Sequence, residues 1–137
     1  MSSVRVLVVD DFEPFRRFVY STLTQRPDLQ IIGEASDGLE AVQKAEALKP
    51  DLILLDIGLP GLSGIEAARR ILQLSPKSKI VVVSQESAPD IVQEALDFGA
   101  SGYVLKAKSA TDLLAAVDAV LEGRLFVSQG LISDGPP

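Results

Sequence analysis

The sequence predicts an α/β protein in which a parallel sheet of five strands is covered by helices on both faces. Five short apolar runs, each of strand length and rich in Val, Ile or Leu, alternate with segments of helical periodicity along the 137 residues. The connections are short, so the chain forms consecutive β-α units in one domain, and such units build a parallel sheet. The predicted strands are Val4–Val9, Leu29–Ala35, Leu52–Leu55, Ile80–Val83 and Gly102–Leu105.

The predicted strands differ in polarity. The first, third and fourth are almost continuously apolar, which is the pattern of strands buried on both faces. The second contains Gly33 and Glu34, and the fifth contains Gly102 and Tyr103. We therefore expect the second and fifth strands at the edges of the sheet.

Five helices are predicted from apolar residues that recur with the helical period. Their apolar faces are Phe15, Phe18, Val19 and Leu23; Ala41, Val42, Ala45 and Leu48; Ile65, Ala68 and Leu72; Ile91, Ala95 and Phe98; and Leu113, Leu114, Val117, Val120 and Leu121. Capping-box patterns at Asp37–Glu40 and Ser63–Glu66, with a looser one at Ser109–Asp112, indicate helix starts. Gly99 and Gly123 stand where a helix favours a left-handed final residue.

Composition restricts the classes of function. The chain contains no Cys and no His, which excludes disulfides, thiolate metal sites and a phosphohistidine of its own. Its net charge of −6 argues against direct binding to nucleic acid. The first apolar run ends at Asp10, too early for a signal peptide, and no stretch reaches the roughly 20 apolar residues of a membrane helix. These features predict a cytoplasmic protein that contacts neither nucleic acid nor membrane.

Polar side chains follow four of the five predicted strands. They are Asp10 and Asp11 after the first strand, Asp56 after the third, Ser84 after the fourth and Lys106 after the fifth. The carboxyl ends of parallel strands lie at one edge of the sheet, where ligands bind in open α/β folds. Clustered carboxylates repel one another, and a divalent cation removes that repulsion. Because Mg²⁺ favours carboxylate, carbonyl and water oxygens, the sequence predicts a Mg²⁺ site here.

Each of these residues also has an ordinary structural interpretation. Asp10 and Asp11 would favour the N-terminus of a helix, and Asp56 would suit a turn. Ser84 would simply end a strand, and Lys106 would be a solvated surface lysine. It is the convergence of all five residues at one edge of the sheet that favours a functional site.

Four segments that contain these residues form a recognisable set: Val8–Asp11, Leu54–Gly64, Val82–Ser84 and Gly102–Lys106. In type, order and spacing they resemble the receiver domains of response regulators, which are CheY-like proteins. The resemblance covers roughly residues 4–124 and implies a flavodoxin-like, doubly wound (βα)5 fold with strand order 2-1-3-4-5. The segment Leu113–Ser128 further resembles regulators of the NarL/FixJ type.

The resemblance implies an acceptor and its metal ligands. Asp56 would accept a phosphoryl group from a sensor histidine kinase or from a small acyl phosphate. Asp11 and Asp56 would ligate Mg²⁺ directly, together with the backbone carbonyl of Gly58. Asp10 would lie close by, often contacting the metal through water.

The resemblance also implies a switch. Lys106 would pair first with the Asp56 carboxylate and then with the phosphoryl oxygens. Ser84 would hydrogen-bond the phosphoryl group, and Tyr103 would rotate between an outward and an inward position. A proline often follows the lysine in this family, in a cis bond. Here the residue is Ala107, before which a cis bond would cost about 3–4 kcal/mol.

The expected function is a phosphorylation-dependent switch of a two-component system rather than a turnover enzyme. We expect the receiver domain at residues 1–124 and a C-terminal tail, or the start of a linker, at residues 125–137. In NarL-type regulators such a linker leads to a helix-turn-helix domain, so transcription would be controlled through a DNA-binding domain outside this chain. Homodimerisation on phosphorylation is a further expectation. The alternative is a receiver-like dimerisation scaffold that is not phosphorylated.

Overall fold

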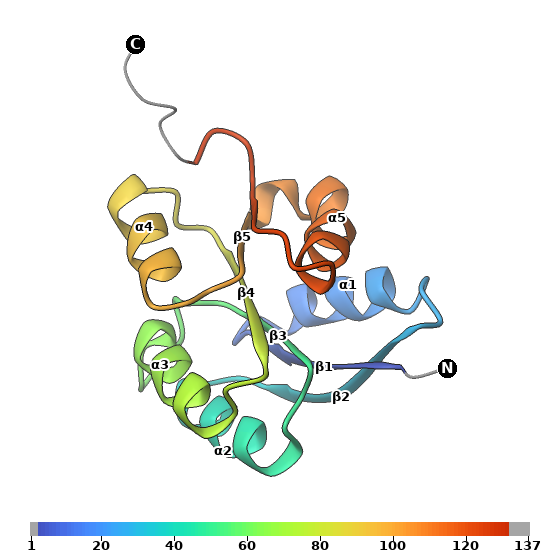
Figure 1. Ribbon diagram of the computed structural model, residues 1–137, viewed down its shortest axis with the longest axis vertical. Helices are drawn as coiled ribbons and strands as arrows, with labels where there is room; N and C mark the ends of the chain where they lie inside the picture. The colour runs from blue at the N-terminus through green and yellow to red at the C-terminus, as the bar shows by residue number, and fades with distance from the viewer. Residues whose placement is uncertain (1–2, 132–137) are drawn as a thin grey trace.

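The computed structural model describes residues 3–131, which form a parallel sheet between two layers of helices (Figure 1). Strands and helices alternate along the chain as predicted. The strands are β1 (Val4–Val9), β2 (Leu29–Ala35), β3 (Leu52–Leu55), β4 (Lys79–Ser84), β5 (Gly102–Leu105) and β6 (Phe126–Val127). The helices are α1 (Glu13–Leu23), α2 (Gly38–Leu48), α3 (Gly64–Leu74), α4 (Pro89–Asp97) and α5 (Ser109–Leu121), with a 3-10 turn, η1, at Lys106–Lys108.

The strand order is β2-β1-β3-β4-β5-β6, and every neighbouring pair is parallel. This confirms the predicted order of the first five strands and the edge position of β2. The expectation that the fifth strand forms the other edge is wrong. There the chain returns after α5 and adds β6, which pairs Phe126 with Gly102 and Val127 with Tyr103. Two residues are too short a run to predict a strand from periodicity.

Different helices cover the two faces of the sheet (Figure 1). Helices α1 and α5 bury their apolar residues on one face, and α2, α3 and α4 bury theirs on the other. Successive residues of β1 point to opposite faces, so Val6 and Val8 join the first core while Leu7 and Val9 join the second. This double coverage is the reason why the central strands are apolar at nearly every position.

Two helix starts are capped as predicted. Asp37 accepts a hydrogen bond from the backbone N–H of Glu40 at 2.8 Å. Ser63 accepts one from the N–H of Glu66 at 3.2 Å. Each cap satisfies one of the N–H groups that have no partner inside the helix.

Of the other predicted helix ends, those at Gly99 and Gly123 are confirmed and the one at Ser109 is wrong. Gly99 and Gly123 have φ values of +113° and +84°, in the region that glycine tolerates best. The predicted cap at Ser109 is wrong, because η1 runs directly into α5 and makes Ser109 a helical residue. Its Oγ is buried without a hydrogen-bond partner.

Across residues 3–131, none of the helices combines the length and the apolarity that crossing a membrane requires. Of the predicted tail at residues 125–137, the last six residues, 132–137, lie outside the described part of the chain.

Candidate functional site

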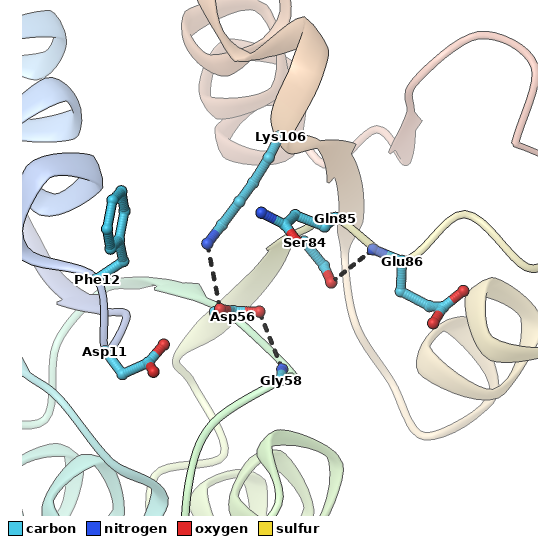
Figure 2. A pocket seen from close by; sticks show the side chains of 8 residues that line it. All are labelled: Asp11, Phe12, Asp56, Gly58, Ser84, Gln85, Glu86 and Lys106. Atoms are coloured by element: carbon cyan, nitrogen blue, oxygen red, sulfur yellow. Dashed lines mark hydrogen bonds and ion pairs between the residues drawn. The ribbon is translucent and has the colours of Figure 1, made fainter.

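The predicted strand-end residues meet at the carboxyl edge of the sheet, where a pocket of about 420 Å³ opens (Figure 2). The pocket is lined by Asp11, Phe12, Asp56, Gly58, Ser84, Gln85, Glu86 and Lys106. Figure 2 shows Lys106 reaching down from the end of β5 toward Asp56, with the backbone of Gly58 on the other side of that carboxylate. Asp10 is buried beside this group.

Three carboxylates come together because β1 and β3 are neighbours. The two strands pair Val9 with Leu55, so the residues that follow each strand also lie side by side. Asp10, Asp11 and Asp56 each offer a carboxylate oxygen, and these oxygens lie within 4.8 Å of one another. Such a set of oxygens fits a hard divalent cation like Mg²⁺.

Lys106 supplies the positive charge of the site. Its Nζ lies 2.7 Å from Oδ2 of Asp10 and 3.2 Å from Oδ2 of Asp56. The expected pairing with Asp56 is therefore shared with Asp10. The ring of Phe15 lies below the same ammonium, with its centroid 4.6 Å from Nζ, within the range of a cation–π contact. The ammonium thus has three favourable partners.

Burial changes the pKa values of this pair. Burial raises the pKa of Asp10, although hydrogen bonds from Lys106 and from the backbone N–H of Phe12 oppose the rise. Burial alone would lower the pKa of Lys106, but its hydrogen bond to Asp10 and the charges of Asp56 and Asp10 outweigh this and raise it. Lys106 therefore stays protonated at neutral pH. With three carboxylates around one ammonium, the cluster keeps a formal charge of about −2, which one divalent ion would neutralise.

The two oxygens of Asp56 have different partners. Oδ1 accepts a hydrogen bond from the backbone N–H of Gly58 at 2.9 Å, and Oδ2 contacts Lys106. A Cβ at Gly58 would lie 3.6 Å from Oδ1, so any side chain there would stand next to the carboxylate. At Gly64 a Cβ would lie only 2.3 Å from the Cα of Ile57, so the loop after β3 can pack this closely on α3 only with glycine there.

Ser84 and Tyr103 are connected through the main chain of Glu86. The Oγ of Ser84 accepts a hydrogen bond from the N–H of Glu86 at 3.1 Å. The hydroxyl of Tyr103 donates to the carbonyl of Glu86 at 2.7 Å. Tyr103 is fully buried, and burial raises the pKa of its hydroxyl.

Sequence reasoning missed several residues of the site. Glu86 takes part through backbone atoms, which no residue type marks. Phe12 is 60% exposed at the pocket mouth, and Gln85 lines the same pocket. Phe15 belongs to the predicted apolar face of α1 and packs against Phe18, but its second contact, with Lys106, does not follow from helical periodicity.

Ala107, which stands where the family often has proline, causes no unusual backbone conformation. The bond between Lys106 and Ala107 is trans, as are the other peptide bonds among residues 3–131. The chain turns instead through η1, which starts at Lys106 and leads into α5.

Known proteins share both the sequence and the fold. The family model for the response regulator receiver domain matches residues 6–118. The nitrate/nitrite response regulator protein NarL of Escherichia coli K12 is 37% identical over 126 residues, which cover 92% of this chain and 58% of NarL. The transcriptional regulatory protein LiaR of Bacillus subtilis is 38% identical over 120 residues, covering 88% of this chain and 57% of LiaR. The chain thus spans somewhat more than half the length of these relatives.

Solved structures agree with the sequence relatives. A two-component response regulator of the LuxR family from Aurantimonas superposes with a TM-score of 0.89 at 32% identity, covering 95% of this chain and 93% of that one. The isolated receiver domain of RcsB from Salmonella enterica, determined with the phosphomimetic BeF3−, superposes with a TM-score of 0.89 at 25% identity, covering 96% and 100%. With its acidic pocket and these matches, the chain belongs to the response regulator receiver domain family and is the receiver domain of a two-component regulator of the NarL type.

Proposed function

We propose that Asp56 accepts a phosphoryl group from the phosphohistidine of a sensor histidine kinase, or from a small acyl phosphate. The observation that carries the proposal is the convergence of Lys106 and two further carboxylates on Asp56 at the floor of an open pocket. As a receiver domain, the chain acts as a switch rather than as a turnover enzyme.

The transfer is a displacement at phosphorus. A carboxylate oxygen of Asp56 forms the new P–O bond, and the bond from phosphorus to the donor nitrogen or acyl oxygen breaks, its electron pair leaving with the donor. The ammonium of Lys106 turns from the carboxylates toward the phosphoryl oxygens and so follows the transferred charge. Positioning and charge neutralisation supply most of the catalysis in such reactions.

The acidic pocket fits Mg²⁺ by its donor chemistry. Asp11, Asp56 and the backbone carbonyl of Gly58 would hold the ion, with Asp10 close by. The chemistry that the ion supplies when bound is neutralisation of negative charge on the phosphoryl oxygens. The protein's own part is to keep two of the carboxylates buried and paired with one lysine, so that the site does not repel an incoming phosphoryl group with its full charge.

The switch uses the connection between Ser84 and Tyr103. Phosphorylation adds about −1.5 to −2 of charge at neutral pH. The hydroxyl of Ser84 turns toward the phosphoryl oxygens and gives up its bond to the N–H of Glu86. The carbonyl of Glu86 accepts the hydrogen bond of the Tyr103 hydroxyl, so this movement weakens or shifts that bond. The surface around α4 and β5 changes shape as a result.

The output lies outside the domain. The expected boundary after residue 124 lies too early for this proposal, because β6 and Leu131 pack into the sheet and the core of the receiver. A linker that follows this segment would lead to a DNA-binding domain that controls transcription. The relatives named as transcriptional regulators support this, as does a solved structure of two RcsB dimers bound to DNA. Homodimerisation on phosphorylation and a cytoplasmic location belong to the same proposal, because both are typical of this family.

Intact-mass spectrometry after incubation with acetyl phosphate tests the proposal. The wild-type chain should gain one phosphoryl group, only when Mg²⁺ is present, and alkali should remove it. Asp56→Asn should gain none. A wild-type chain that stays unmodified with both acetyl phosphate and a panel of phosphorylated kinases would contradict the proposal and favour a scaffold that is not phosphorylated.

A further inference from the structure

The C-terminal segment Phe126–Leu131 packs against the strand that leads to the functional site. Strand β6 extends the sheet beside β5, and the N–H of Ser128 donates to the carbonyl of Tyr103 at 2.9 Å. Leu131 is buried in the same apolar core as Tyr103. The family match ends at residue 118, so this segment lies outside the matched region.

Ser128 carries a buried hydrogen-bond relay. Its Oγ accepts a hydrogen bond from the N–H of Leu105 at 3.0 Å and donates one to the carboxylate of Asp112 at 2.7 Å. Ser128 itself is 2% exposed, whereas Leu105 and Asp112 are half-buried, so water has limited access to these bonds. Because its acceptor is charged, the hydroxyl is polarised and becomes a better acceptor for Leu105. The relay ties the end of β5 to the first turn of α5 and to the C-terminal segment.

The relay ends one residue before Lys106. Leu105 is the last residue of β5, and Lys106 is the first residue of η1. On the other side of Lys106, the Nζ of Lys108 donates to the carbonyl of Gln129 at 2.7 Å. The residues on both sides of Lys106 therefore contact the same segment, Leu105 through its main chain and Lys108 through its side chain. From this point the side chain of Lys106 must reach both buried carboxylates.

We infer that Ser128 is a positioning residue for phosphoryl transfer, acting through Lys106. The inference rests on the proposed role of Asp56. One ammonium has to contact two carboxylates and then the phosphoryl oxygens, so a shift of the main chain at the end of β5 lengthens all of these contacts. Ser128 lies on the segment that leads out of the domain. Since coupling between two sites is reciprocal, phosphorylation or BeF3− binding also changes how strongly the segment Phe126–Leu131 binds to the rest of the domain.

Three variants of the full chain test the inference. Ser128→Ala should lower the rate constant of phosphorylation by acetyl phosphate, and the affinity for BeF3− with Mg²⁺, about tenfold, the effect of one hydrogen bond to a charged group. Ser128→Thr keeps the hydroxyl and should restore most of both values. Ser78→Ala is the matched control. It deletes a hydroxyl that is 4% exposed and donates to the carbonyl of Pro50, at the opposite end of the sheet, and should match wild type.

Hydrogen exchange of the wild-type chain gives a readout that does not depend on a variant. The amides of Leu105 and Ser128 should exchange faster when BeF3− and Mg²⁺ are added, because Lys106 is drawn toward the bound anion. Equal rate constants for wild type and Ser128→Ala, an equal loss in Ser78→Ala, or unchanged exchange at both amides would each overturn the inference while leaving Asp56 as acceptor. A wild-type chain that takes up neither acetyl phosphate nor BeF3− would overturn the proposed function, and this inference with it.

Discussion

Replacing Lys106 by Met would remove the cation that two buried carboxylates share. Met keeps much of the length of the lysine stem and adapts to irregular space, so the change isolates the charge. Asp10 and Asp56 are only 2% and 7% exposed. Removing one partner of a buried ion pair costs about 3–5 kcal/mol, because the other charge stays buried. The pocket above the carboxylates admits water, so we expect the lower end of this range, about 3 kcal/mol of unfolding free energy.

Urea denaturation followed by circular dichroism measures this loss. In EDTA, Lys106→Met should lose about 3 kcal/mol, whereas Lys44→Met should lose less than about 1 kcal/mol. Lys44 is the control because its ion pair with Glu40, at 3.1 Å, is 40% exposed on the lysine side. Mg²⁺ should stabilise Lys106→Met more than wild type, since the uncompensated carboxylates bind a cation more tightly. Equal losses for the two variants in EDTA would refute the view that Lys106 balances the charge of the site.

Three further predictions concern neighbouring residues. Asp11→Asn should raise the unfolding free energy in EDTA by about 0.5–1 kcal/mol, because it relieves repulsion among the carboxylates. The same variant should lose the stabilisation by Mg²⁺. Thermal unfolding with and without Mg²⁺ checks both results. Gly58→Met should lengthen the lifetime of the phosphorylated state, because its side chain would start 3.6 Å from Oδ1 of Asp56 and obstruct water; equal lifetimes by intact mass would contradict this. The backbone N–H of Ser36, and then Lys44, hold the pKa of Glu40 below its ordinary 4.5. The folded state thus favours the charged form, so this contribution to stability is present above pH 4.5 and is lost as pH falls through the lowered pKa. Urea midpoints measured from pH 6 downward should fall less steeply for Glu40→Gln, and parallel curves would count against it.

The placement of the predicted site residues could be read from the sequence because it depends on two local facts. Asp10, Asp56 and Lys106 directly follow an apolar strand, and Ser84 is the last residue of one. The alternation of strands and helices makes those strands parallel. Parallel strands deliver their carboxyl ends to one edge, so no knowledge of packing is needed. The order of the strands followed from the resemblance to a known family. The chemical roles of these residues stay predictions.

The features that could not be predicted depend on backbone atoms or on contacts distant in sequence. Strand β6 has two residues, which carry no periodic signal, yet it removes the edge position of β5. The hydroxyl of Ser128 reaches Leu105, 23 residues away, and takes the Asp112 carboxylate that the looser capping pattern would have used. Ser109 in turn becomes a helical residue with a buried Oγ. Tertiary contacts override local signals at such places.

The main-chain connection between Ser84 and Tyr103 determines which substitutions the domain tolerates at position 86. Every amino acid except proline offers the same N–H and carbonyl, so nearly any residue at position 86 can make both hydrogen bonds. Proline lacks the N–H and would remove the bond to Ser84. The side chain of Glu86 accepts a hydrogen bond from the N–H of Ala88, at 3.0 Å on the surface. Substitutions of Glu86 by residues other than proline should therefore keep both main-chain hydrogen bonds while they change the charge and shape of the pocket lining.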